Sequence, residues 1–272
     1  MTSNGLCVHC VSGTTMGGEP RGTMEKIGPY PTYITHPSSG APTDASRAIL
    51  YAYDAFGLGL NNNKILPDVL ADKTGMTVYV PDIFEGDCVP SDAMRMPTTA
   101  KETREQGYVA KFLTMLQILP RLPWAYRNYP YAKRLATVGA WADALKTERG
   151  VQRLGGVGYC YGGKIVARMD AAGKLSAAVY CHPSFMKKDD FEEAQSPSLF
   201  LCAEEDMVFG PALKKTAEEV FERRGEVVKG EFHQYENTTH GFAARPNLQD
   251  PQVKAAFEDA TEKTVQWFKT HL

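Results

Sequence analysis

The sequence carries no strong excess of charge of either sign. Its 272 residues include 30 Lys and Arg against 32 Asp and Glu, a formal net charge of −2 at pH 7. Proteins that bind nucleic acid usually show a basic patch or a high isoelectric point. We therefore expect no nucleic-acid partner, and a small molecule as the substrate.

Long apolar runs are also missing. No stretch approaches the roughly 18 consecutive apolar residues expected of a membrane-spanning helix. The first residues, Met1 to Cys10, lack the basic start and apolar run of a secretory signal. The sequence therefore predicts a cytoplasmic protein without a membrane partner. Since no coiled coil is evident, a monomer or a homodimer is expected.

Cysteine is scarce, and its spacing does not suggest a disulfide framework. The cysteines are Cys7, Cys10, Cys88, Cys160, Cys181 and Cys202. Spread over a long chain without a secretion signal, they favour reduced thiols. Cys7 and Cys10 form a C-x-x-C, but zinc would need two more ligands and only His9 is nearby. A reduced N-terminal arm is the better interpretation than a metal site.

What the sequence does contain is a regular alternation of strand and helix patterns. This alternation favours one α/β domain over residues 1–272, with a mostly parallel sheet covered by helices on both faces. Strands are predicted at 31–35 (as an edge strand), 47–54, 76–81, 154–159, 175–180, 198–203 and 231–235, and helices at 61–73, 109–119, 131–145, 164–172, 212–224 and 253–268.

Two segments fall outside the alternation. We interpret residues 1–28, approximately, as an N-terminal arm. The stretch from about 86 to 131 is irregular, with several prolines and an aromatic cluster that includes Trp124 and Tyr126. Two interpretations of this stretch stay open. Its aromatic residues either anchor a loop or helix to the body, or form a cap that shapes a substrate pocket.

The most informative motif is Gly158-Tyr159-Cys160-Tyr161-Gly162. It lies between a predicted strand and a predicted helix, the context of the nucleophile elbow G-x-S-x-G, with cysteine in place of serine. The glycines leave room for the neighbouring strand and helix. A helix that begins at the nucleophile favours a thiolate and a developing oxyanion. A buried cysteine in a glycine-rich turn is the alternative interpretation.

Two more residues are candidate partners of Cys160. Asp206 follows one predicted strand, with Glu204 and Glu205 as rival carboxylates, and His240 lies on a loop that follows another. Ligands of such sheets bind at the carboxyl ends of the strands, so these side chains should converge. The chain order Cys, Asp, His is also that of the α/β-hydrolase triad.

The motifs GYCYGG, EED and HGFAAR together resemble those of the dienelactone hydrolase family, and the resemblance covers nearly the whole chain. Elements of the N-terminal arm resemble eukaryotic members. The resemblance implies an α/β-hydrolase fold without a metal or organic cofactor. It also implies a Cys-His-Asp triad, here Cys160, His240 and Asp206, that opens enol lactones or related esters. The backbone N–H groups of Ala55 and Tyr161 would form its oxyanion hole.

The substrate-binding positions depart from the family pattern. Asp54 stands where the family has a glutamate that bonds the resting cysteine, and it either reaches Cys160 or satisfies backbone donors in a turn. The family pattern has two arginines that hold a substrate carboxylate. At the first position this sequence has residues 85–87 instead, and Arg245 lies one residue away from the second position. Arg245 therefore either orients substrate or caps a surface loop. We expect a larger or less acidic ester, lactone or thioester.

Three classes of function remain open. A hydrolase would use Cys160 to form an acyl-enzyme that water then cleaves. An isomerase, cyclase or acyl transferase could use the same scaffold, favoured by a dry pocket lined by Trp124 and Tyr126. A non-catalytic binding protein is disfavoured, because all three triad positions hold competent residues. His182, which follows a predicted strand, either lines the pocket or is a hydrogen-bonded structural residue.

Overall fold

The computed structural model describes residues 16–40, 43–90, 96–116, 119–128, 131–225 and 227–272. The C-x-x-C of Cys7 and Cys10 therefore lies outside the described residues. Among the described helices, none combines the length and the hydrophobicity needed to cross a membrane.

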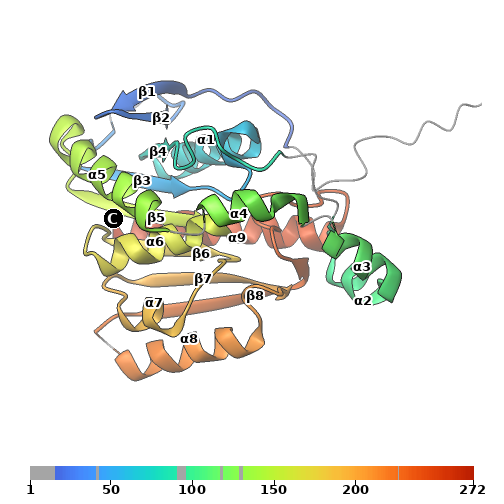
Figure 1. Ribbon diagram of the computed structural model, residues 1–272. Helices are drawn as coiled ribbons and strands as arrows, with labels where there is room; N and C mark the ends of the chain where they lie inside the picture. The colour runs from blue at the N-terminus through green and yellow to red at the C-terminus, as the bar shows by residue number, and fades with distance from the viewer. Residues whose placement is uncertain (1–15, 41–42, 91–95, 117–118, 129–130, 226) are drawn as a thin grey trace, which may run out of the picture.

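A single sheet forms the centre of the molecule. Its strands are β1 (Thr23–Ile27), β2 (Tyr30–Thr35), β3 (Arg47–Ala52), β4 (Thr77–Pro81), β5 (Arg153–Tyr159), β6 (Ala177–Cys181), β7 (Ser198–Glu205) and β8 (Gly230–Thr239). They lie in the order β1-β2-β4-β3-β5-β6-β7-β8 (Figure 1). The first two pairs in this order are antiparallel and the rest are parallel. The mostly parallel sheet predicted from the alternation is confirmed.

Helices cover both faces of this sheet. They are α1 (Asn62–Thr74), α2 (Ala100–Glu105), α3 (Tyr108–Leu116), α4 (Leu122–Asn128), α5 (Tyr131–Arg149), α6 (Tyr161–Ala171), α7 (Lys188–Glu192), α8 (Pro211–Arg224) and α9 (Pro251–His271), with short 3₁₀ turns η2 (Gly57–Gly59) and η3 (Leu119–Arg121). Helices α1 and α9 lie on one face, and α5, α6 and α8 on the other (Figure 1).

Because both faces are covered, the inner strands are apolar along their whole length. Every residue of β4 (TVYVP) and of β6 (AAVYC) is buried, and so is all of β3 after Arg47. On the α8 face, Phe200 of β7 stacks on Phe232 of β8 at 4.4 Å between ring centres. This core holds the carboxyl ends of β3, β5, β6, β7 and β8 at one common edge.

Several short elements differ from the prediction. The segment interpreted as an arm contributes β1, which is the outer edge of the sheet. The strand predicted as an edge at 31–35 is β2, and it lies inside the sheet between β1 and β4. All of β1 except Ile27 is exposed, so its sequence (TMEKI) shows no buried face. Helices α2, α4 and α7 were not predicted from the sequence either, and each of them is short.

The irregular stretch contributes α2, α3, η3 and α4. Helix α2 lies beside the end of β8, and α3 projects from the body next to it (Figure 1). Arg104 of α2 fastens this part to the sheet through ion pairs with Glu204 and Glu205. Large apolar side chains on α3 face solvent; Tyr108, for example, is 94% exposed.

Candidate active site

Cys160 occupies the sharp turn between β5 and α6. Its backbone has φ 51° and ψ −113°, a conformation that a residue with a side chain adopts only at a cost in strain. A Cβ atom on Gly158 would collide with the carbonyl of Gly162, and one on Gly162 would collide with the carbonyl of Ala52. The steric reason expected for both glycines is confirmed, and the turn has the geometry of a nucleophile elbow.

The two amides expected to form an oxyanion hole lie at the same edge of the sheet. Tyr161 is the first residue of α6. Its N–H group is therefore one of those in the first turn that have no acceptor within the helix. Ala55 follows β3 in a turn that the N–H of Gly57 closes by donating to the carbonyl of Asp54, at 3.2 Å. Because β3 and β5 are parallel neighbours, both residues lie at the carboxyl edge of these two strands.

Asp206 and His240 meet at the ends of β7 and β8. Asp206 follows β7 directly, and β8 continues to Thr239, so the histidine follows the strand without the longer loop predicted from the sequence. The His240 Nδ1 atom lies 2.9 Å from Asp206 Oδ2. The other carboxylate oxygen accepts hydrogen bonds from the N–H groups of Val208 at 2.8 Å and Phe209 at 2.9 Å. These contacts fix the carboxylate against the imidazole ring.

The rival carboxylates point elsewhere. Glu204 lies 2.5 Å from Arg104 Nη2 and also accepts from the N–H of Asn237. Glu205 lies 2.7 Å from Arg104 Nε. Both glutamates therefore secure α2, and the structure brings Asp206 rather than either of them to His240.

Cys160, His240 and Asp206 shift one another's pKa values. Burial alone would raise the pKa of the Cys160 thiol, but the adjacent His240 overcomes burial and lowers it. Burial also opposes charge on His240, yet Cys160 and Asp206 raise the pKa of the ring to about 10. Burial would raise the pKa of Asp206 as well, but the imidazole and the two backbone donors lower it to about 2. The arrangement therefore stabilises the charged form of each group, namely the thiolate, the imidazolium and the carboxylate, relative to its neutral form.

Ser184 is a site residue that the sequence did not reveal. Its hydroxyl oxygen lies 3.3 Å from the sulfur of Cys160 and 3.4 Å from Nε2 of His240. It sits in the loop after β6, the strand next to β5. The only available signal was this position at the carboxyl edge of the sheet.

His182 lies beneath the site. It is fully buried, and its ring packs edge-on against His240 at 5.0 Å between ring centres and against Phe242 at 5.8 Å. Burial holds the pKa of His182 well below its usual range, so the ring is neutral. Neither ring nitrogen has a hydrogen-bond partner among the described residues. Full burial argues against pocket lining, and the side-chain hydrogen bonds expected of a structural histidine are not found among the described residues either. Within the described ranges, no group of three or more His, Cys, Asp or Glu side chains is arranged to hold a metal.

Asp54 and Arg245 are paired with each other. Asp54 Oδ1 accepts from the N–H of Phe56 at 3.1 Å and from the amide of Asn63 at 3.0 Å. Its Oδ2 atom lies 3.2 Å from Arg245 Nε, and the guanidinium lies over the Phe56 ring at 4.4 Å. Asp54 therefore serves the turn, as the second interpretation expected. Arg245 is mostly buried and does not cap a surface loop.

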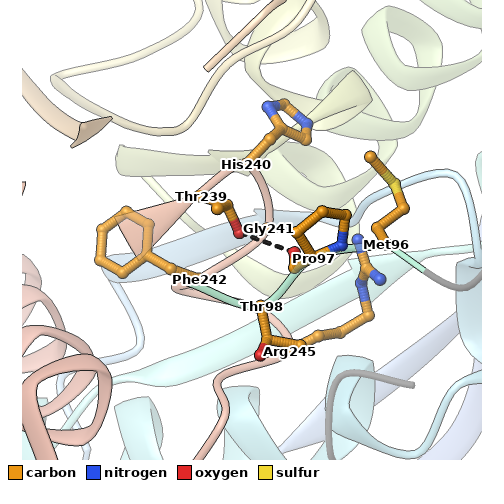
Figure 2. Close-up of a pocket in the computed structure, with 8 residues that line it drawn as sticks. All are labelled: Met96, Pro97, Thr98, Thr239, His240, Gly241, Phe242 and Arg245. Carbon is orange, nitrogen blue, oxygen red and sulfur yellow. Dashed lines mark hydrogen bonds between the residues drawn. The ribbon is translucent and has the colours of Figure 1, made fainter. Parts of the chain in front are cut away.

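A small cavity opens beside His240. Its lining includes Met96, Pro97, Thr98, Thr239, His240, Gly241, Phe242 and Arg245, as Figure 2 shows. Its volume is about 20 Å³, close to the space of one water molecule. The hydroxyl of Thr239 donates to the carbonyl of Pro97 at 3.1 Å and holds segment 96–98 in place (Figure 2).

The aromatic residues predicted to shape the pocket behave differently from one another. The Trp124 indole donates to the carbonyl of Asp87 at 2.7 Å and packs edge-on against Phe84 and Tyr161. Trp124 thus anchors α4 to the body next to Tyr161, the first residue of α6. Tyr126 is 83% exposed, so it neither anchors the helix nor lines a pocket. Only one side of α4 faces the body.

Comparisons with known proteins identify the family of the chain. The model of the dienelactone hydrolase family matches residues 32–272. The hydrolase pyvD of Aspergillus violaceofuscus is 30% identical over 272 residues, which cover 100% of this chain and 99% of that protein. Dienlactone hydrolase 1 of Gibberella moniliformis is 25% identical, covering 96% of this chain and 92% of its own.

A solved structure extends the comparison to the fold. Dienelactone hydrolase from Anabaena variabilis superposes with a TM-score of 0.60, covering 93% of this chain and 98% of the other. Its sequence identity is 12%, so the likeness concerns the fold alone. The predicted α/β-hydrolase fold is confirmed.

Proposed function

The chain belongs to the dienelactone hydrolase family, and we propose that it cleaves an ester or lactone bond through an acyl-enzyme on Cys160. The observation that carries the proposal is the pairing of His240 with Asp206 at the carboxyl edge of the sheet, where the imidazole lowers the pKa of the Cys160 thiol. A thiolate is the reactive form of cysteine, and this environment favours it.

The proposed reaction has two stages. The thiolate of Cys160 attacks the ester carbonyl carbon, while the N–H groups of Ala55 and Tyr161 stabilise the oxyanion. Loss of one such donor typically costs about 3 kcal/mol. As the C–O bond breaks, His240 gives its proton to the leaving oxygen. Neutral His240 then takes a proton from water, which attacks the thioester and releases the acid and the thiolate.

The pairing of Arg245 suggests the class of substrate. Its guanidinium is already bound to Asp54, a side chain that is 1% exposed, so its charge is largely neutralised within the protein. An arginine in this state is poorly suited to bind a substrate carboxylate. We therefore propose an uncharged or weakly acidic ester, lactone or thioester.

The proposal is tested by the turnover of aryl esters, simple lactones and a dienelactone, measured for the wild type and for Cys160→Ala. We expect the substitution to reduce kcat by a factor of about 10⁴ or more. Trapping of a thioester on the Cys160 peptide by rapid quench and mass spectrometry would support the acyl-enzyme directly. Equal turnover by the two proteins would exclude Cys160 as the nucleophile.

The small cavity keeps a second reaction type open. An isomerase, cyclase or acyl transferase would complete its reaction without water, and a site with room for about one water molecule is compatible with that. Reaction in heavy-oxygen water separates the two. A hydrolase incorporates solvent oxygen into the released acid, whereas the alternative enzymes do not.

A further inference from the structure

The Ser184 hydroxyl occupies a position between the two reacting side chains. The residue is only 2% exposed, and its oxygen lies 3.3 Å from Cys160 Sγ and 3.4 Å from His240 Nε2. A hydroxyl has one proton to donate and two lone pairs to accept with. It can therefore donate to a thiolate on one side and accept from the imidazolium N–H on the other.

The backbone around Ser184 fixes this position. The Ser184 N–H donates to the carbonyl of Cys160 at 2.9 Å, and the Cys160 N–H donates to the carbonyl of Cys181 at 3.2 Å. His182 and Phe185, on either side of the serine, have φ of 37° and 60°. Such strained conformations persist only where the surroundings determine them. The loop is thus held against the nucleophile elbow in one arrangement.

A neutral hydrogen-bond donor can stabilise the thiolate of Cys160 in addition to the charged groups around the sulfur. His240 favours the thiolate, whereas Asp54, from the turn after β3, opposes it. Arg245 is engaged with Asp54, Asp206 lies behind His240, and His182 is neutral. The hydroxyl of Ser184 adds a hydrogen bond that lowers the pKa of the thiol without adding a charge.

We propose that Ser184 is a positioning residue that donates a hydrogen bond to the Cys160 thiolate and holds the sulfur between itself and His240. The proposal rests on the proposed function, because it assigns Ser184 a role at the same nucleophile. Ser184 makes no bond to the substrate; it acts through the orientation and charge of Cys160.

The test is the pH dependence of alkylation of Cys160 by iodoacetamide, quantified on the Cys160 peptide by mass spectrometry. We expect Ser184→Ala to raise the apparent pKa of the thiol by about one unit, since a charged group loses one hydrogen bond. With an aryl ester at pH 7, kcat should fall about tenfold while KM stays unchanged. Ser184→Thr, which keeps a hydroxyl, should restore most of both effects.

Ser198→Ala is the matched control. This serine is also fully buried, but its hydroxyl donates to the carbonyl of Ser196, away from the elbow. We expect its alkylation profile to match the wild type. If Ser184→Ala, with its melting temperature checked, also keeps the wild-type profile, the proposal is overturned. Alkylation needs no substrate, so this outcome is distinct from a failure of the proposed hydrolase function, which Cys160→Ala reports.

Discussion

At the scale of single residues, the orientation of the His240 ring depends on one carboxylate. We expect Asp206→Asn to lower kcat by a factor of about 10³ to 10⁴, because the amide cannot hold the same tautomer or stabilise the imidazolium. Steady-state kinetics with an aryl ester measures this. Glu204→Gln is the control, since it loses an ion pair with Arg104 but leaves Asp206 in place. Similar losses in the two variants would contradict the assignment.

The pKa of His240 also predicts how stability depends on pH. The folded protein raises this pKa from 6.5 to about 10, so the ring binds its proton more tightly when folded than when unfolded. Its contribution is complete below pH 6.5 and is lost as the pH rises towards 10. We expect the wild type to lose its melting-temperature advantage over His240→Gln across this range. A constant difference from pH 6 to 10 would contradict the raised pKa.

Sequence alone could predict Cys160, Asp206 and His240, because each follows a buried strand and their chain order is typical of one fold. Ser184 could not be predicted in this way. A lone serine after a strand forms no pattern, and its orientation depends on the strained loop around it. The place of Tyr126 stayed open between an anchor and a pocket cap, since an aromatic cluster does not reveal which face of a helix meets the body.

At the scale of elements, segment 96–98 forms one wall of the cavity beside His240. Met96 lines the cavity beside His240, and its side chain is flexible and uncharged (Figure 2). We expect Met96→Ala to lower KM for esters with bulky acyl groups several-fold, with little change for an acetyl ester. Met24→Ala, on the exposed edge strand β1, is the control. An unchanged ratio of KM values between the two esters would show that Met96 does not restrict access.

The start of α9 offers a test of stability. The Asp250 carboxylate accepts hydrogen bonds from the N–H groups of Gln252 and Val253, and Pro251 is the first residue of the helix. We expect Asp250→Ala to reduce the free energy of unfolding by about 1 kcal/mol, the usual loss for a helix N-cap. Urea denaturation measures it. The exposed neighbour Gln249, changed to Ala, should have little effect, and an equal loss there would argue against capping.

The accuracy of the predicted elements follows from burial. Inner strands and the helices that cover them have apolar patterns, and these elements were predicted within a few residues. The end of β8 was placed too early because Asn237, Thr238 and Thr239 are polar. In the structure, a register shift lets Thr239 pair with Glu205, and the strand continues to Thr239. This pairing depends on β7, so local sequence could not show it.

At the scale of the whole molecule, the alternation of strands and helices predicted the architecture because it repeats along most of the chain. The arrangement of residues 86–131 could not be predicted in the same way. Its described helices are attached by a few specific contacts, such as Arg104 with Glu205 and Trp124 with Asp87, instead of by a continuous apolar face. Such contacts leave no periodic signal in the sequence.

The helix pair on one face of the sheet has a consequence for synthesis on the ribosome. Helix α1 is made early and α9 late, yet they lie side by side, with Lys73 and Glu262 joined by an ion pair at 3.1 Å. Helix α9 also covers β6, β7 and β8. Until α9 leaves the exit tunnel, those strands have no helix over this face. Their apolar side chains stay accessible to chaperones, and folding of this face waits until α9 has been made.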